Sequence, residues 1–247
     1  GLVSGLVTNG SRLSDKVYVQ SLSDAGLDFV QITLESNLPE VHDKMTCAVG
    51  SWAQTVQGIK NALSSQIYVS TNTTLTTINV DHALRTLEFV RELGVKDFSC
   101  NSLIHSGRGI SSSGSLALPI EGVKSTLSAL KERSEELGMN FTWFTPTRYC
   151  ELNPVNMGLG IKSCSAALLN MCIGPNGDVY PCQSYFKPVG NILRDSWEDI
   201  WNNPLCVELR GRKYAPEECN GCSDLRICGA GCPLELANDP HACQEAH

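Results

Sequence analysis

The sequence predicts an α/β fold in which a parallel sheet built from βα units is followed by a small, cysteine-rich module. Two observations carry this prediction. Apolar, strand-like runs alternate with amphipathic helical segments through roughly the first 140 residues, which is typical of a parallel sheet with helices outside it, open or closed as a barrel. Ten of the twelve cysteines then lie between Cys150 and Cys243, and this crowding indicates a site that needs thiolates.

Four βα units follow one another in the first part of the chain. Their expected strand and helix segments are 3–8 with 17–25, 29–34 with 50–63, 67–73 with 80–93, and 98–103 with 120–137. Further on, a Pro-Asn-Gly-Asp turn signal at 175–178 precedes a strand at 179–180, so we expect a β-hairpin that delivers Cys182. These patterns predict two domains, the βα units in residues 1–145 and the cysteine-rich module in residues 146–247.

Charge and hydropathy exclude several classes of protein. The formal net charge is −7, whereas a nucleic-acid-binding protein normally carries a basic stripe or domain, so we expect no DNA or RNA partner. No window approaches the run of about 18 apolar residues that a membrane span needs, and no secretion signal opens the chain. We therefore expect a cytoplasmic protein with no membrane partner. Because the chain opens at Gly1 directly on an apolar strand, we also expect that upstream residues are missing.

The spacing of the cysteines limits which metal centres they could bind. A short C-x2-C turn directs two thiolates at one metal, and thiols stay free for metal binding in a reducing cytosol. Zinc, iron–sulfur clusters and structural free thiols all stay open, but a zinc ribbon normally needs two C-x2-C knuckles and only one is present, which favours iron–sulfur. The full pattern is C-x12-G-x4-C, a gap, C-x2-C-x5-C-x3-C, a gap and a last C, at Cys164, Gly177, Cys182, Cys219, Cys222, Cys228, Cys232 and Cys243.

This pattern resembles the SPASM module of radical S-adenosylmethionine (radical SAM) enzymes, which holds two auxiliary four-iron four-sulfur clusters. The resemblance implies that Cys164, Cys182 and Cys232 bind the first cluster. We expect Cys150 to be its fourth ligand, because Cys150 precedes Cys164 in the same connecting segment. Cys172 is the rival, although it could equally be a packed core thiol. The implied ligands of the second cluster are Cys219, Cys222, Cys228 and Cys243.

The βα units resemble the core of the same family, a partial TIM-like (βα) barrel of six units, of which about four are visible here. Ligands of parallel α/β folds bind at the carboxyl ends of the strands. For Thr33 and Asn72, an ordinary role as strand-end polar groups is the alternative. His42 and His105 lie in expected loops, and we expect them at the surface. The implied contacts to S-adenosylmethionine are Thr33 and Glu35 at its ribose or methionine end, Asn72 through a hydrogen bond, and Ile104 against adenine.

The family's C-x3-C-x2-C motif, which binds the radical-generating cluster, is absent from the 247 residues. The resemblance therefore implies a third four-iron four-sulfur cluster in a missing N-terminal part, and a chain that is inactive alone. The intact enzyme would cleave S-adenosylmethionine to a 5′-deoxyadenosyl radical and modify a peptide, a protein or a small cofactor precursor, with a reductant such as ferredoxin or flavodoxin. The alternatives are a zinc-binding structural module and a ferredoxin-like electron-transfer protein.

Overall fold

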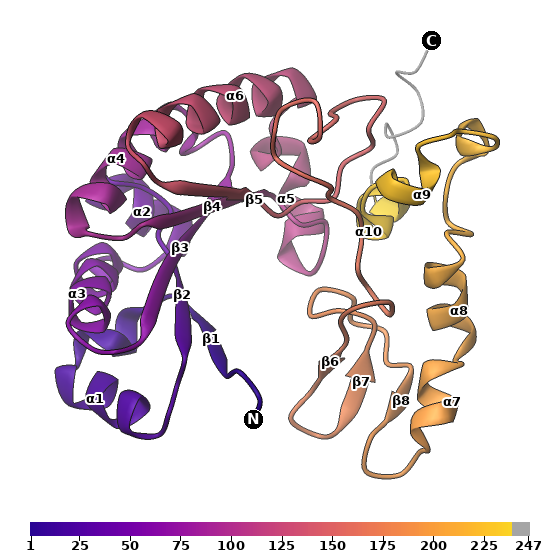
Figure 1. The fold of residues 1–247 in the computed structure, drawn as a ribbon, viewed down its shortest axis with the longest axis horizontal. Helices are drawn as coiled ribbons and strands as arrows, with labels where there is room; N and C mark the ends of the chain where they lie inside the picture. Colours follow the sequence, from indigo (N-terminus) through magenta and orange to yellow (C-terminus); the bar gives the residue numbers. More distant parts are fainter. Residues whose placement is uncertain (239–247) are drawn as a thin grey trace. The chain divides into compact units, whose positions relative to one another are not determined.

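The computed structural model describes residues 1–238 and divides into two compact units. The first unit holds residues 1–103 and 115–144, and the second holds residues 104–114 and the chain from 145 onward. Figure 1 colours the chain from indigo at its start to yellow near its end, so that each unit can be followed. The domain limits expected from the sequence, 1–145 and 146–247, stay a prediction.

The first unit is built on five parallel strands that lie in chain order. Four of them were expected from the sequence, and β5 was not. Its four residues are too short to stand out in the sequence, and the strand forms because Phe141 pairs with Phe98 of β4 and stacks on its ring at a centroid distance of 6.2 Å. The strands are β1 (Gly5–Thr8), β2 (Phe29–Thr33), β3 (Tyr68–Leu75), β4 (Asp97–Ser102) and β5 (Asn140–Trp143).

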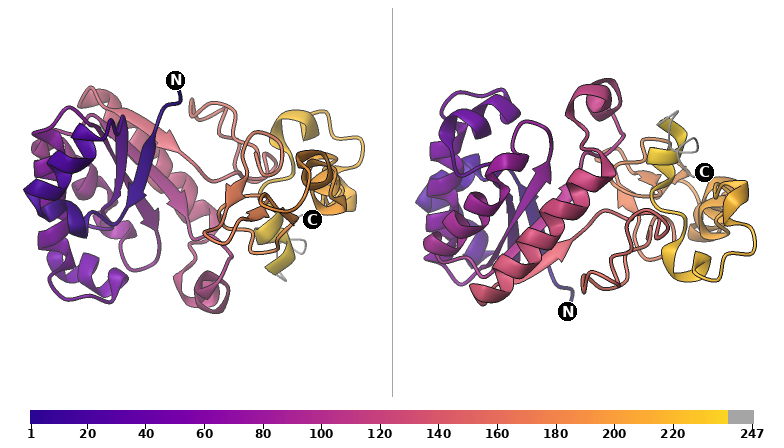
Figure 2. Two further views of the ribbon diagram at one scale, coloured as in Figure 1. Left: turned by 90° about the horizontal axis from the view of Figure 1, so that it is seen from below. Right: turned by 90° about the horizontal axis from the view of Figure 1, so that it is seen from above.

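Helices cover one face of this sheet, as the views in Figures 1 and 2 agree. Their apolar sides bury Ile59, Leu87 and Leu127 completely, together with Val30 and Ile32 of the sheet. This burial is the main stabilising contribution to the unit. The helices of this part of the chain are α1 (Lys16–Asp24), α2 (Pro39–Thr46), α3 (Ser51–Leu63), α4 (Ala83–Leu93) and α6 (Ile120–Glu136), and α5 (Arg108–Leu116) begins in the second unit.

The second unit contains a three-stranded antiparallel sheet and short helices. The expected hairpin is present, since β6 pairs with β7 across the turn at 175–178. Its apolar core is small and is centred on Val179, Ile200 and Leu209, and a core of this size gives little stability by itself. The elements are β6 (Cys172–Ile173), β7 (Asp178–Tyr180), β8 (Gly190–Asn191), α7 (Trp197–Trp201), α8 (Pro204–Arg210), α9 (Leu225–Cys228) and α10 (Pro233–Asn238).

Within residues 1–238, none of the helices combines the length and the apolar composition that a membrane crossing requires.

Candidate functional site

One face of the five-stranded sheet is polar. Val30, Ile32 and Val69 are buried on the face that α3 contacts. Side chains alternate along a strand, so the residues between them point to the opposite face. When a parallel sheet packs against apolar layers on both faces, its strands have nearly continuous apolar sequences. The strands of this sheet do not, so its second face is suitable for a polar ligand. The residues of this face at the middle and carboxyl ends of the strands are Gln31, Thr33, Ser70, Asn72, Thr74, Ser99 and Asn101.

Two of the predicted ligand-binding residues, Thr33 and Asn72, are neighbours on this face. They pair directly across β2 and β3. The Asn72 side chain is fixed on its other side, because its Nδ2 donates to Oδ1 of Asn101 at 2.7 Å and its Oδ1 accepts from Oγ of Ser99 at 3.1 Å. Sequence reasoning missed Ser99 and Asn101 as part of this cluster, although their alternation with buried Phe98 and Cys100 is visible in the sequence.

Glu35 lies just beyond β2 and is held by three separate contacts. The backbone N–H of Thr74 donates to Oε2 of Glu35 at 2.8 Å. The Glu35 backbone N–H donates to Nδ1 of His42 at 3.1 Å, and its carbonyl accepts from Nδ2 of Asn79 at 2.8 Å. Burial raises the pKa of Glu35 to about 7, against the opposing effect of the Thr74 hydrogen bonds. Glu35 is therefore a positioned carboxylate that titrates near neutral pH, a property that is common at functional sites.

His42 is a supporting residue, and its expected place in a surface loop is wrong. It lies in α2 with 1% of its surface exposed. Burial lowers the pKa of His42, and Asp43 opposes this only in part, so the ring stays neutral and its Nδ1 can accept from Glu35. Its Nε2 is buried without a hydrogen-bond partner among residues 1–238. The surface prediction also fails for His105, of which 9% is exposed.

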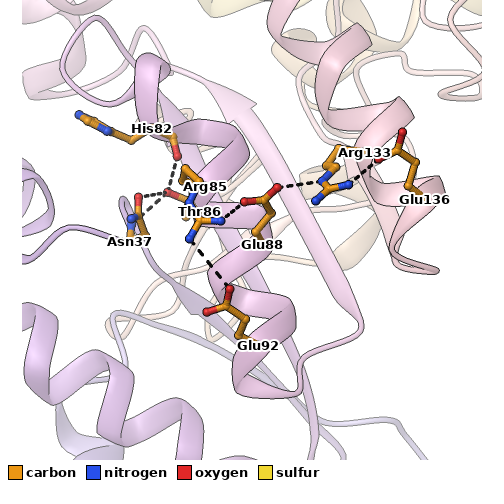
Figure 3. A network of polar contacts seen from close by, with 8 residues as sticks. All are labelled: Asn37, His82, Arg85, Thr86, Glu88, Glu92, Arg133 and Glu136. Atoms are coloured by element: carbon orange, nitrogen blue, oxygen red, sulfur yellow. Dashed lines mark hydrogen bonds and ion pairs between the residues drawn. The ribbon is translucent and has the colours of Figure 1, made fainter.

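The loop after Glu35 is tied to the helix layer through α4. Oγ1 of Thr86 accepts from the Asn37 backbone N–H at 3.0 Å and donates to the carbonyl of His82 at 2.9 Å (Figure 3). Along the same helix, Glu88 accepts from Nε of Arg133 on α6 at 2.8 Å. These contacts connect the strand ends to two packed helices, so the geometry around Glu35 is set by the scaffold rather than by a free loop.

Ile104, the fourth residue expected to contact S-adenosylmethionine, belongs to the second compact unit. Its side chain is 41% exposed. Its expected packing against adenine stays a prediction.

Eight described cysteines of the second unit fall into two groups, and Cys206 belongs to neither because it is buried in the apolar core. The first cysteine group consists of Cys164, Cys172, Cys182 and Cys232. Burial raises the pKa of Cys182, and the neighbouring Cys164 and Cys172 thiols raise it further. Burial also raises the pKa of Cys232 to about 12. Backbone N–H groups at the start of α10 oppose this increase, and the neighbouring Cys164 thiol contributes to it. The group is assembled by the hairpin, since Cys172 opens β6 and Cys182 follows β7.

The second cysteine group consists of Cys150, Cys219, Cys222 and Cys228. The pKa of Cys219 is raised first by burial, and then by Cys150, Cys228 and Cys222 in that order. The turn before Cys150 packs directly on this group, because the backbone N–H of Tyr149 donates to Sγ of Cys228 at 3.3 Å. The structure thus brings Cys172 to the first group and Cys150 to the second. Cys243, an implied ligand of the second cluster, lies outside the described residues.

These donor sets fit iron–sulfur clusters in their chemistry. All donors are thiols, which suit iron–sulfur clusters and zinc alike. Among residues 1–238, no three His, Cys, Asp or Glu side chains converge closely enough to hold a single metal ion. A four-iron cluster distributes its thiolates over four separate irons, so its ligands need not converge on one point. The raised pKa of Cys182, Cys219 and Cys232 follows chiefly from burial, and metal binding would compensate for it by stabilising the thiolates.

Comparisons with known proteins agree with both parts of this description. Residues 2–90 match the model of the radical SAM superfamily, and residues 164–223 match the model of the SPASM iron–sulfur cluster-binding domain. Among curated proteins, the chain is 24% identical over 94% of its length to the AdoMet-dependent heme synthase of Methanosarcina barkeri, and 26% identical over 98% of its length to the PqqA peptide cyclase of Ruegeria pomeroyi. It spans 69% and 66% of those two relatives.

Solved structures of the same fold are also similar. Streptococcus suis SuiB bound to its precursor peptide SuiA superposes with a TM-score of 0.66 at 17% identity. The superposition covers 97% of this chain and 58% of that chain. At this level of identity, the likeness shows the fold alone.

Proposed function

The chain belongs to the radical SAM superfamily and carries a SPASM-type iron–sulfur domain, and on that premise we propose that it forms part of an enzyme that modifies a peptide by radical chemistry. The observation that carries this proposal is the separation of eight described thiols of the second unit into two groups. Two thiolate-bound clusters require such an arrangement. We propose that the radical-generating cluster is bound by a C-x3-C-x2-C segment that is not among these residues.

A peptide is the favoured substrate class. One relative is named as a peptide cyclase, and one structural neighbour was solved with a precursor peptide. The polar sheet face suits such a substrate or cofactor, because its amide and hydroxyl groups can both donate and accept hydrogen bonds. The heme synthase among the relatives supports a small cofactor precursor as the second candidate.

The ligands of the first cluster are proposed to be Cys164, Cys182, Cys232 and Cys172. The position of Cys172 supports this choice over Cys150, because Cys172 interacts with Cys182, whereas Cys150 interacts with Cys219. The strand register agrees: Cys172 pairs with Tyr180, two residues before Cys182, and diagonal neighbours in antiparallel strands are within reach of each other. From the second group we propose Cys219, Cys222 and Cys228 as ligands of the second cluster, with Cys243, which the SPASM resemblance implies, as the fourth ligand in place of Cys150.

The bound clusters and S-adenosylmethionine would supply the electrons and the radical. The residues of the chain would bind and orient them. Glu35 would accept hydrogen bonds from the ribose hydroxyls, and Thr33 and Asn72 would hydrogen-bond the cofactor along the same face, with Ile104 against adenine. The Tyr149 backbone N–H would hydrogen-bond the sulfur of Cys228, a contact of the kind that sets cluster potentials. A cytoplasmic reductant such as ferredoxin or flavodoxin is the proposed electron donor.

The activity can be tested by the cleavage of S-adenosylmethionine. With dithionite under anaerobic conditions, the reconstituted 247-residue chain is expected to release no 5′-deoxyadenosine, because it contains no C-x3-C-x2-C motif. The same residues in a longer protein that carries the motif are expected to release 5′-deoxyadenosine. Release by the 247-residue chain, or no release by the longer protein with all its clusters in place, would contradict the proposed function.

A further inference from the structure

Arg212 connects the segments that carry the two cysteine groups. Its Nη2 donates to the carbonyl oxygen of Cys164 at 2.8 Å, and its Nη1 donates to the hydroxyl of Tyr214 at 2.9 Å. The Tyr214 hydroxyl in turn donates to the carbonyl oxygen of Gly229 at 2.8 Å. Gly229 directly follows Cys228, so one guanidinium links a cysteine of the first group to the backbone beside a cysteine of the second.

Two unusual backbone positions place this guanidinium. Arg212 has a φ of 55°, in the left-handed region that side-chain-bearing residues rarely adopt. Gly229 has a φ of 68°, and a Cβ added there would lie 3.0 Å from Cζ of Arg212. The guanidinium thus fills the space that the missing side chain of Gly229 leaves. Strain of this kind persists where the surroundings hold it, and it is frequent at functional sites.

The charge of Arg212 has no acidic partner in the part of the chain that the structure describes. The ion pairs among residues 1–238 do not include it, and its two hydrogen bonds shown here go to neutral oxygens. The side chain is half-buried. Because part of the guanidinium is shielded from water, a nearby anion would stabilise it, and the ion pairs of the described residues include no Asp or Glu that does so.

The packing around Arg212 indicates which negative group this is. Tyr214, which accepts from Arg212, packs against the buried apolar core that contains Cys164, and Cys182 packs against the same core. Arg212 and Tyr214 therefore lie beside two proposed ligands of the first cluster. A cluster bound by thiolates carries net negative charge, and reduction makes that charge larger.

We propose that Arg212 is the counter-cation of the first auxiliary cluster and raises its reduction potential. This inference rests on the proposed iron–sulfur function. A fixed positive charge stabilises the reduced, more negative form of the cluster more than the oxidised form. Loss of the charge should lower the midpoint potential of one cluster and leave the other nearly unchanged.

The test is a potentiometric titration of the anaerobically reconstituted 247-residue chain, followed by electron paramagnetic resonance, with iron and sulfide measured in each sample. Arg212→Met removes the charge at similar length, and Arg212→Lys keeps the charge without the planar fork. Arg194→Met is the matched control, because Arg194 is an exposed cation of the same unit. We expect Arg212→Met to shift one of the two reduction steps downward by at least about tenfold in its equilibrium constant, which is 59 mV for one electron. Arg212→Lys should shift it less, and Arg194→Met should not shift it.

Gly229→Ala tests the same inference without a change in charge. It should displace the guanidinium and lower the same step. Gly160→Ala is its control, because Gly160 has a φ of 74° with no atom within 4 Å of an added Cβ, so it imposes similar backbone strain and displaces nothing.

The results distinguish failure of the counter-cation role of Arg212 from failure of the proposed iron–sulfur function. Unchanged steps in Arg212→Met with full iron content would overturn the counter-cation role. If Arg212→Met loses iron, Arg212→Lys decides: retention of iron supports the role of charge, and equal loss of iron in both variants overturns it. A wild-type chain that binds no iron would instead refute the proposed function itself.

Discussion

Cys222→Ala is expected to remove one of two clusters from the reconstituted chain and to disorder residues 206–238, while the five-stranded sheet stays folded. The described residues from 206 onward form short helices, and their buried apolar residues are few. Cluster binding would therefore supply much of the folding free energy of this segment, as it does in other small metal-bound modules. The sheet of the first unit has its own apolar core, so we expect it to be unaffected.

The measurements are iron content and limited proteolysis. Iron should fall from about eight to about four per chain, and trypsin should cut faster after Arg210, Lys213 and Arg226. Cys47→Ala is the control, since Cys47 is an exposed thiol of the first unit and should change neither quantity. If Cys222→Ala keeps the full iron content and the proteolysis pattern of the wild type, the assignment of Cys222 as a ligand fails.

The same assay distinguishes the two candidates for the fourth ligand of the first cluster. Cys172→Ser should lower the iron content by loss or degradation of that cluster, and Cys150→Ser should leave it intact. Full iron content in Cys172→Ser would exclude Cys172 as the fourth ligand and would show that the hairpin register is not what selects the fourth thiol.

Glu35→Ala is expected to weaken the binding of S-adenosylmethionine by roughly tenfold to a hundredfold, since hydrogen bonds to a charged acceptor contribute about 1.5–3 kcal/mol. Ribose hydroxyls donate more strongly to the ionised carboxylate than to the neutral acid. With a pKa of about 7, the ionised fraction of Glu35 falls roughly tenfold between pH 8 and pH 6. Wild-type affinity, measured by equilibrium dialysis with the 247-residue chain, should therefore decrease as the pH is lowered through this range.

Glu35→Gln is the control, because it preserves the shape of Glu35 and an acceptor for the Thr74 N–H. The affinity of Glu35→Gln for S-adenosylmethionine should be lower at pH 8, and its pH dependence should lack the part that Glu35 causes.

The effect of Glu35→Gln on stability should have the opposite sign, because the stability of the variant should increase relative to that of the wild type as the pH rises. The pKa of Glu35 is raised from 4.5 to about 7 in the folded chain, so the folded state holds a proton that the unfolded state releases, and wild-type stability falls as the pH rises between these values. Thermal unfolding should show Glu35→Gln gaining stability relative to the wild type from pH 5 to pH 8. If Glu35→Gln binds S-adenosylmethionine with the same pH profile as the wild type, Glu35 is not part of the cofactor site.

The sequence predicts those elements that bury a periodic apolar stripe. The four expected strands correspond to β1–β4, and the four expected helices correspond to α1, α3, α4 and α6, with differences of a few residues at their ends. β5 was missed because its formation depends on pairing with β4, which is a tertiary interaction. The helix α2 was missed for a similar reason, because it is short and its junction with α3 is fixed by contacts from Asp43 to Gly50 and Trp52.

The details of the candidate site depend on contacts between distant residues. Nothing in the local sequence shows that His42 accepts a hydrogen bond from the backbone of Glu35, or that Asn101 fixes Asn72. The spacing of the cysteines indicates cluster ligands, but it does not show which of two extra thiols joins which group. That information comes from the hairpin register and from the contact between Tyr149 and Cys228.

The central claim is that the second unit binds two four-iron four-sulfur clusters, and the most direct test is a metal analysis of the anaerobically reconstituted 247-residue chain. We predict about eight irons and eight acid-labile sulfides per chain, with visible absorption from the clusters. Zinc without sulfide, and a colourless protein, would contradict the claim and would leave a structural zinc module in its place.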